Sequence, residues 1–260
     1  MVLIMMKKLE LHYNEVIMAT KIEWTEETWN PITGCTKISD GCKNCYAEKM
    51  AFRLQAMGTK GYEKGFILTL QPQRLEEPIK NKKTTFYFVN SMSDLFHEKV
   101  PFEYIDKVFD TIRKTPWHKY QILTKRADIM YNYFQSRTVP DNAWIGVTAE
   151  NQRQGKPRID LLRKINAKIH FLSIEPLLED LGKLDLTNIQ WVIVGGESGP
   201  NARPMKEEWV LNIQKQCDDK NVAFFFKQWG TWGADNKKRS KHANGKLLQG
   251  KIYQKFPDAV

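Results

Sequence analysis

Cysteine and histidine are scarce in this chain, which has four cysteines and five histidines in 260 residues. It contains no GxGxxG, no GxxxxGK(S/T) and no HExxH, so signatures of dinucleotide binding, P-loop phosphate binding and zinc proteases are missing. Nothing marks a nucleophile elbow. No apolar run approaches the ~20 residues of a membrane-spanning helix, and Met1–Ile4 is too short for a signal peptide. We therefore expect a soluble, cytoplasmic protein with no membrane partner.

Acidic residues are also in deficit, because 30 Asp and Glu face 40 Lys and Arg, which gives a formal charge of +10. A surplus of this size favours an acidic partner, above all a nucleic acid. The alternative is general lysine richness, since lysine is spread along the chain with one real concentration at Lys237–Lys241. Hydrophobic residues make up 42% of the chain, which is enough for a sizeable core.

Three of the four cysteines, Cys35, Cys42 and Cys45, lie in one short segment, and Asp40-Gly41 favours a turn between the first two. Thiolates this close can bind one metal centre, and a C-x2-C pair can place both sulfurs on one metal or on neighbouring irons. Three interpretations are open: an iron–sulfur cluster held by three thiolates with one open iron, a zinc site with a fourth ligand elsewhere, and unligated thiols or a disulfide. The last is the weakest, because reducing compartments disfavour disulfides and no export signal is present.

The surroundings of the cysteines favour the cluster over zinc. A structural zinc site usually carries a second CxxC or a histidine pair, whereas the nearest histidines here are His12 and His97. A helical pattern over Tyr46–Met57 follows the last cysteine directly. The three cysteines are therefore expected in a loop between the first strand and the first helix.

Short apolar segments alternate with amphipathic helices along the chain, which is typical of parallel βαβ units. The expected strands are the segment before the cysteines and the runs Thr85–Asn90, Tyr120–Thr124, Trp144–Thr148, His170–Ile174, Trp191–Val194 and Ala223–Lys227. The expected helices include Tyr46–Met57, Ala127–Arg137, Pro157–Ile165 and Lys206–Asp219. This count predicts an α/β fold, a TIM-like (β/α) partial barrel with about six to seven parallel strands. An open doubly wound sheet is the alternative.

Three parts of the chain differ in composition. Residues 21–230 form the expected barrel domain, and residues 231–260 form a small basic C-terminal extension in which Leu247–Tyr253 predicts a hairpin that closes the barrel end. Residues 1–20 show no clear period. We interpret them as a disordered or mis-annotated extension with Met18 as the true start, and the alternative is a genuine segment beginning at Met1.

Polar and charged residues follow nearly every expected strand. Because the carboxyl ends of parallel strands meet at one edge, ligands bind there. The residues at these ends include Asn90, Ser91, Asp94, Thr124, Lys125, Arg126, Thr148, Glu150, Ser173, Glu175, Gly195, Gly196, Glu197, Ser198, Lys227 and Gln228. We expect many of them to face one shared cavity beside the cysteines.

The cysteine loop resembles the cluster loop of radical S-adenosylmethionine (radical SAM) enzymes. The terminal C-x2-C agrees with their pattern, but six residues separate the first two cysteines instead of three, and the aromatic Tyr46 follows the last cysteine instead of preceding it. The chain also resembles a phage and prophage family of unknown function with a three-cysteine motif. The matching stretches include Ile22–Thr25, Thr28–Pro31, Asn90–Phe96, Leu123–Arg126, Ser173–Pro176, Gly195–Gly199 and Phe226–Gly230.

The radical SAM resemblance implies a [4Fe–4S] cluster bound by Cys35, Cys42 and Cys45, with S-adenosylmethionine (SAM) on the open iron and a 5′-deoxyadenosyl radical as the reactive product. It also implies a six-fold partial barrel and an external electron donor, and we expect a partner protein encoded nearby. Gly-Gly-Glu commonly binds the SAM ammonium after the second strand of such enzymes, but Gly195-Gly196-Glu197 follows about the sixth strand here. The expected SAM-binding residues are Ser91 and Asp94 by position, together with Glu150, Glu175, Gly195, Gly196, Glu197 and Ser198.

Four cations at the strand ends, Lys125, Arg126, Arg203 and Lys227, are expected to bind a phosphate or carboxylate of the substrate. The alternative is ordinary pairing with Glu150, Glu175 or Glu197. The leading hypothesis is a radical SAM-like enzyme acting on a nucleic acid, nucleotide or base in a phage or prophage setting, with no catalytic residue assigned. One alternative is a zinc-containing nucleic-acid-binding protein without catalysis, and another is a barrel enzyme whose cysteines are only a structural clamp. Cys217 is expected to be a buried core thiol.

Overall fold

The computed structural model describes residues 22–258, so the predicted extension over residues 1–20 and the proposed start at Met18 lie outside the described residues. Within this range one sheet has seven strands, and every neighbouring pair is parallel. In spatial order they are β1 (Glu27–Trp29), β4 (Phe86–Val89), β5 (Lys119–Thr124), β6 (Ala143–Thr148), β7 (His170–Ile174), β8 (Trp191–Gly195) and β9 (Ala223–Gln228). A short antiparallel pair is formed by β2 (Ile32–Thr33) and β3 (Thr69–Leu70).

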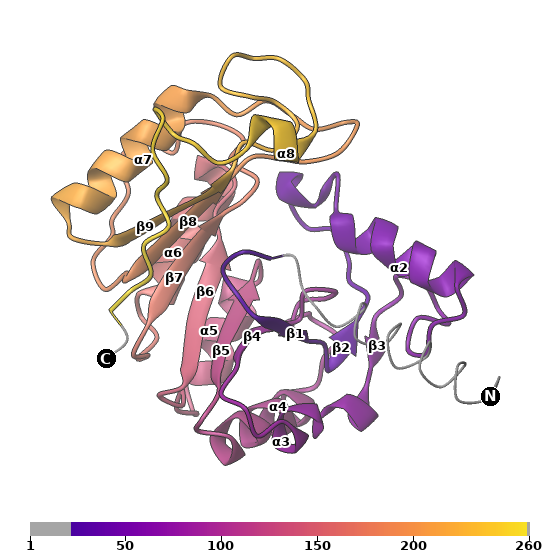
Figure 1. Ribbon diagram of the computed structural model, residues 1–260. Helices are drawn as coiled ribbons and strands as arrows, with labels where there is room; N and C mark the ends of the chain where they lie inside the picture. The colour runs from indigo at the N-terminus through magenta and orange to yellow at the C-terminus, as the bar shows by residue number, and fades with distance from the viewer. Residues whose placement is uncertain (1–21, 259–260) are drawn as a thin grey trace.

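The sheet curls into a half-barrel with α2 standing across its open side (Figure 1). The described helices are α2 (Tyr46–Ala56), α3 (Glu77–Lys80), α4 (Phe102–Lys114), α5 (Ala127–Phe134), α6 (Gln152–Leu162), α7 (Glu207–Asp219) and α8 (Lys241–Asn244), with 3-10 turns η1 (Asp40–Cys42) and η2 (Pro72–Arg74). The strand order rises along the sheet without a reversal, as a barrel requires and a doubly wound sheet does not. The predicted partial barrel is confirmed, and the doubly wound alternative is wrong.

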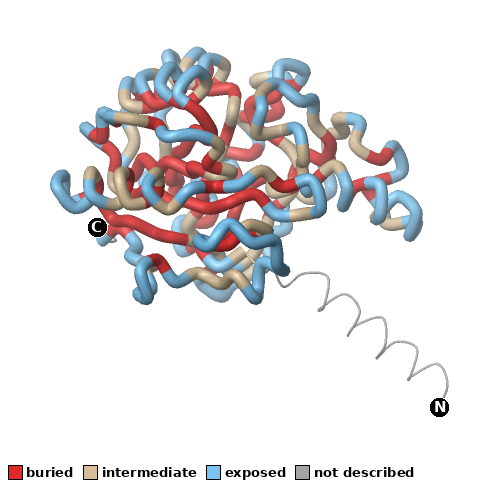
Figure 2. Tube along the Cα trace, turned by 90° about the horizontal axis from the view of Figure 1, so that it is seen from above, coloured by how far each residue is buried: buried red, intermediate tan, exposed pale blue. Residues whose placement is uncertain are grey.

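The two faces of the sheet carry different side chains, because successive residues of a strand point to opposite faces. The face toward the helices contributes aliphatic residues such as Val89, Val147 and Leu172 to the main core. The inner face forms a second cluster dominated by the aromatic rings of Phe88, Trp144, Phe171, Trp191 and Phe225, with Trp24. Figure 2 shows the buried residues gathered in the middle of the molecule. Because aromatic rings fill the inside of the half-barrel, the polar residues lie beyond them at the carboxyl ends.

Helix α6 begins five residues earlier than the sequence pattern predicts. The expectation placed its start at Pro157, whereas the helix starts at Gln152 and Pro157 lies inside it. The reason is a cap: the Asn151 side chain accepts a hydrogen bond from Gln154 N–H at 2.8 Å. Asn151 thus ends the turn that follows β6 and directs the chain into the helix.

The C-terminal segment packs on the barrel edge. Leu248 and Lys251 pair as the predicted hairpin, and Gln254 pairs antiparallel with Phe225 of β9. The side chains of Lys246 and Gln254 both donate to Glu23 Oε2 at 2.7 Å, just before β1. This segment therefore connects the last strand with the approach to the first. Within residues 22–258 no helix is long and apolar enough to cross a bilayer.

Candidate functional site

The cysteine loop runs from β2 to α2 and is fixed at both ends by backbone hydrogen bonds. Gly34 N–H donates to Met92 O at 3.0 Å, and Cys35 N–H donates to Phe66 O at 3.1 Å. Near the end, η1 forms the turn that Asp40-Gly41 predicted, with Cys42 N–H donating to Ser39 O at 2.9 Å. Cys35, Cys42 and Cys45 are half-buried free thiols. The loop thus presents three soft sulfur donors beside the residues that follow β4.

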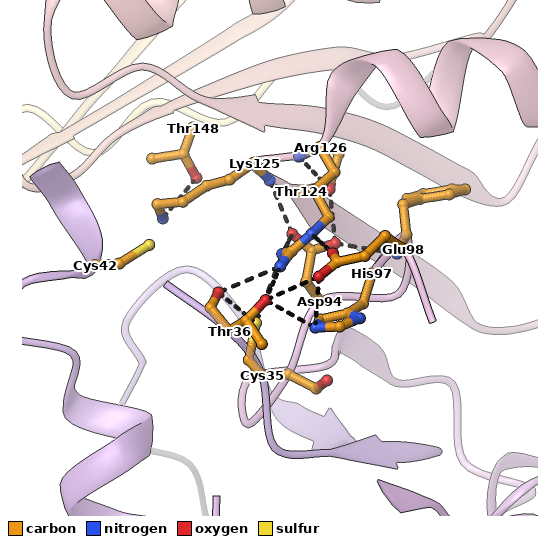
Figure 3. A network of polar contacts seen from close by, with 12 residues as sticks. Cys35, Thr36, Cys42, Asp94, His97, Glu98, Thr124, Lys125, Arg126 and Thr148 are labelled. Atoms are coloured by element: carbon orange, nitrogen blue, oxygen red, sulfur yellow. Dashed lines mark hydrogen bonds and ion pairs between the residues drawn. The ribbon is translucent and has the colours of Figure 1, made fainter. Parts of the chain in front are cut away.

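Arg126, two residues after the end of β5, is hydrogen-bonded to the first part of this loop. Its side chain is buried, and every one of its five N–H groups has an acceptor. Nε donates to Glu98 Oε2 at 2.7 Å, Nη1 to Asp94 Oδ2 at 3.2 Å and Cys35 Sγ at 3.6 Å, and Nη2 to the carbonyl and hydroxyl oxygens of Thr36 at 3.2 and 2.8 Å. Figure 3 shows the guanidinium at the centre of this network. Arg126 therefore has no N–H group left for a substrate.

Asp94 forms a buried ion pair with Arg126 and is itself held by several hydrogen bonds. Its Oδ1 accepts from Thr124 Oγ1 at 2.6 Å and from Phe96 N–H at 3.0 Å, and its Oδ2 accepts from Lys125 N–H at 3.0 Å as well as from Arg126. Burial and then the Asp94 charge raise the pKa of the Cys35 thiol to about 11, against the lowering influence of Arg126. Asp94 thus holds Arg126 against the cysteine loop and also acts on Cys35 directly through its charge.

Lys125, the neighbour of Arg126, turns toward the second cysteine. Its Nζ donates to Thr148 Oγ1 at 3.3 Å, and Figure 3 shows this end of the side chain near Cys42. Burial opposes ionisation of Cys42, yet Lys125, together with hydrogen bonds from the loop, lowers the pKa of that thiol below its ordinary value. Two consecutive residues at the end of β5 thus bring one cation to Cys35 and one to Cys42.

Glu150, after β6, lies against the turn of the cysteine loop. A Cβ placed on Gly41 would be 3.1 Å from Glu150 Oε1, so the glycine permits this approach. Arg158 Nη1 donates to Glu150 Oε2 at 2.6 Å. Burial opposes ionisation of Glu150, but Lys125 and Arg158 lower its pKa. The buried carboxylate is therefore charged and lies between a lysine, an arginine and the loop.

Glu197, after β8, is paired with Arg203, and Arg203 also contacts the loop. The guanidinium makes two bonds to the carboxylate, Nη2 to Oε1 at 2.6 Å and Nε to Oε2 at 2.9 Å, and Nη2 also donates to Asp40 O at 2.9 Å. Burial opposes ionisation of Glu197, but Arg203 outweighs it and lowers the pKa. The Glu197–Arg203 ion pair therefore connects the end of β8 to the cysteine loop.

The carboxyl ends of the strands together form the edge that we call the rim. The remaining predicted residues follow β7, β8 and β9 on this rim. Lys227 Nζ donates to both oxygens of Glu175 at 2.8 and 2.9 Å, and a Cβ on Gly195 would be 3.2 Å from Glu175 Cδ. Gln228 Nε2 donates to Ser198 Oγ at 3.3 Å. The pairing alternative therefore describes Lys227 and Arg203, both of which neutralise a strand-end carboxylate. Across the rim, Ser91 Oγ donates to Asn30 Oδ1 at 3.2 Å.

Some residues of the site escaped the sequence reasoning. Thr36 and Glu98 both contact Arg126, and Glu98 lies in the loop before α4, where no pattern signals a role. Tyr46 was noted only as an aromatic, yet its hydroxyl donates to Ser91 O. Asn90 was indicated by its place at a strand end, but not its conformation: it has a left-handed φ of 64° and a buried amide with neither atom hydrogen-bonded within the described residues.

The chemistry of the three soft sulfur donors fits an iron–sulfur cluster. Within residues 22–258 no three His, Cys, Asp or Glu side chains are close enough to share one metal ion. A cluster needs a wider spacing, because each thiolate binds a different iron. Three thiols on one loop, with cations beside two of them, suit a negatively charged cluster–thiolate unit.

The fold and the site together define an α/β half-barrel protein with a three-thiol loop at the carboxyl edge of its sheet. The chain belongs to the family described as Protein of unknown function (DUF5131), whose model matches residues 19–257. No curated protein gives a significant match to the chain.

Among solved structures, a cysteine mutant of spore photoproduct lyase is similar, with 14% identity and a TM-score of 0.44 over 69% of this chain and 58% of that one. A double mutant of the same lyase with bound AdoMet and dinucleoside spore photoproduct has 12% identity and a TM-score of 0.44 over 76% of this chain and 62% of that one. The chain thus covers about three fifths of the length of these lyase chains.

Proposed function

We propose that this protein is a radical SAM-type iron–sulfur enzyme. Cys35, Cys42 and Cys45 would each bind one iron of a [4Fe–4S] cluster, and the fourth iron would stay open for the amino and carboxylate groups of SAM. The observation that carries the proposal is the placement of three free, half-buried thiols on one loop at the carboxyl edge of a parallel half-barrel. Ligands bind at this edge in parallel α/β folds.

The chemistry that a bound cluster would supply is the transfer of one electron to SAM, with cleavage of a carbon–sulfur bond to methionine and a 5′-deoxyadenosyl radical. The chain contributes binding, orientation and exclusion of water. The rim residues that would hold SAM are Ser91, Glu150, Glu175, Gly195, Gly196, Glu197 and Ser198, with Asp94 acting through Arg126. The aromatic cluster beneath the rim would close the reaction space from the opposite end of the half-barrel.

The proposed substrate is a nucleic acid, nucleotide or base, in a phage or prophage setting. The formal charge of +10 supports this class. Of the four cations predicted to bind substrate, Lys125 makes no direct ion pair in the described part of the chain, although its charge stabilises the Glu150 carboxylate. Arg126, Arg203 and Lys227 contact carboxylates directly. Lys125 is therefore the first candidate to receive a phosphate or carboxylate. The proposal also includes an external electron donor, a partner protein encoded nearby and a cytoplasmic location.

Anaerobic purification followed by iron and sulfide analysis tests this function. We expect a brown protein with about four irons per chain that releases 5′-deoxyadenosine after addition of dithionite and SAM. The variant Cys42→Ala should hold fewer than about two irons, because three thiolates are needed for the cluster. The matched control is Cys217→Ala, whose thiol is buried in α7 and should not affect iron content.

A colourless protein with stoichiometric zinc after anaerobic reconstitution would remove the enzyme proposal and favour zinc-dependent nucleic-acid binding. Normal chemistry in Cys42→Ala with only lower thermal stability would show that the cysteines are a structural clamp.

A further inference from the structure

Arg126 and Lys125 are consecutive in the sequence, but their side chains reach different cysteines (Figure 3). Arg126 contacts Cys35 Sγ through Nη1 at 3.6 Å, and Lys125 lies on the side of Cys42, where it donates to Thr148. The two cations follow the last residue of β5, and the Arg126 side chain contacts the cysteine loop at Cys35 and Thr36. The sequence therefore places two positive charges beside the proposed cluster from one position of the sheet.

The contact between Arg126 and Cys35 is rigid. Arg126 is 4% exposed and its partner Asp94 is 6% exposed, and all five N–H groups of the guanidinium are used. A surface lysine could swing away from a sulfur at little cost, whereas movement of Arg126 would leave the buried Asp94 carboxylate without its cation. Its N–H group therefore stays directed at the sulfur.

A hydrogen-bond donor held at a cluster thiolate changes the reduction potential of the cluster. Reduction adds one electron to the cluster–thiolate unit and makes its charge more negative by one, so a hydrogen bond or a cation at the sulfur stabilises the reduced form. Burial strengthens this effect, because the local dielectric is low. Loss of Arg126 would also leave the Asp94 charge unpaired near Cys35, and that charge opposes an added electron.

We propose that Arg126 is a positioning residue that holds Cys35 in place and raises the reduction potential of the bound cluster, with Lys125 as a second, weaker contributor at Cys42. This inference rests on the proposed function. The reaction concerned is the transfer of one electron from an external one-electron donor to the cluster, with no bond formed or broken in the protein. Arg126 thereby sets how negative the reduction potential of that electron donor must be.

The test is a mediated potentiometric titration of the reconstituted full chain, followed by electron paramagnetic resonance, for wild type, Arg126→Gln, Arg126→Lys and Lys125→Gln. At a fixed potential we expect at least a tenfold lower ratio of reduced to oxidised cluster in Arg126→Gln, which corresponds to a shift of about 59 mV to more negative values for one electron. Arg126→Lys should fall between this variant and wild type, because it keeps the charge but loses the planar fork. Lys125→Gln should shift in the same direction by less.

Arg137→Gln is the matched control, because Arg137 pairs with Asp106 through two bonds, 2.6 and 3.0 Å, beyond the opposite end of α5. Its cluster should titrate at the wild-type potential. If Arg126→Gln does not fold, Arg126→Lys and Lys125→Gln decide the question. If Arg126→Lys and Lys125→Gln both have full iron content and the wild-type reduction potential, the inference is overturned and the proposed function stays intact. A wild-type chain that takes up no iron would instead remove the proposed function.

Discussion

At the residue scale, the buried polar groups of this chain differ in whether they have partners. His170 in β7 donates through Nδ1 to Asn188 O at 2.8 Å, but its Nε2 is buried without a hydrogen bond. Burial lowers the pKa of this imidazole below its ordinary value of 6.5, since the charged ring would be poorly solvated. The folded chain thus holds His170 neutral.

This histidine should make stability depend on pH. Its folded pKa is below the unfolded one, so the unfolded chain binds the proton first as pH falls below about 6.5. We expect the free energy of unfolding to fall between pH 7.5 and 5.5 in urea titrations, and His170→Asn to reduce that fall, because asparagine keeps a donor for Asn188 without titrating. Some fall should remain, since burial also lowers the pKa of His97.

The same substitution at the exposed His242 on α8, His242→Asn, is the control for replacing a histidine by asparagine. An unchanged pH profile in His170→Asn would mean that the ring is protonated as easily in the folded chain as in the unfolded one.

The sequence alone indicated the three cysteines by their spacing and most of the rim residues by their place after the strands, because strand ends in a parallel sheet meet at one edge. It could not indicate the partner of each cation. Arg203 pairs with Glu197 because the chain turns back after β8, and Arg126 reaches Glu98 because the loop before α4 folds over β5. Such pairings depend on loop geometry, which carries no period along the sequence.

At the scale of elements, the cysteine loop depends on the backbone just before it. Gly34 has φ +76°, and a Cβ there would lie 2.3 Å from Ile67 O, so both the conformation and the space require glycine. Gly58 at the end of α2 has a similar φ of +66°, but nothing lies within 4 Å of its Cβ position. The two glycines thus separate the effect of a left-handed backbone from the effect of a steric clash.

Gly58→Ala should therefore lower the free energy of unfolding by about 1 kcal/mol, which is the typical cost of a left-handed non-glycine residue. Gly34→Ala should lower it by about 3 kcal/mol, because the backbone must also move away from residue 67. Urea denaturation measures both. The shift should displace Cys35 as well, so Gly34→Ala should bind less iron than Gly58→Ala after equal reconstitution. Equal losses of stability in the two variants would contradict the close packing of the loop.

The strands were predictable as elements because parallel strands buried on both faces appear as short continuous apolar runs. Trp191–Val194 and Ala223–Lys227 match β8 and β9 to within one residue at either end. The start of α6 was not predictable from Pro157, because the Asn151 cap lies six residues upstream of the proline. A proline signals a helix start only when no better cap precedes it.

At the scale of the whole molecule, a half-barrel leaves two edges, at β1 and β9, that must be covered. The segment after residue 245 pairs with β9 and provides carbonyl acceptors for buried donors. Phe226 N–H donates to Tyr253 O at 2.7 Å, Trp229 Nε1 to Leu247 O at 2.8 Å and Trp191 Nε1 to Lys255 O at 3.0 Å. The predicted boundary at residue 230 thus separates two stretches that pack against each other, although the basic run within the extension is exposed.

A chain ending at Gly245 should therefore be far less stable than the full chain. It would lose the fully buried Leu248, worth about 2 kcal/mol, and would leave three donors unpaired at a cost of about 1–3 kcal/mol each where water cannot reach them. We expect a loss of roughly 5 kcal/mol or more in urea denaturation, with added exposure of the Trp191 ring detected by fluorescence.

The double variant Lys237→Gln/Lys241→Gln changes the same extension without touching the barrel, because both side chains are exposed. Its stability should stay within about 0.5 kcal/mol of wild type. If both the shortened chain and this variant unfold at the wild-type urea concentration, the half-barrel is stable without its C-terminal segment. If only the shortened chain is destabilised, closure of the β9 edge is part of the fold, and the rim that holds the cysteine loop depends on it.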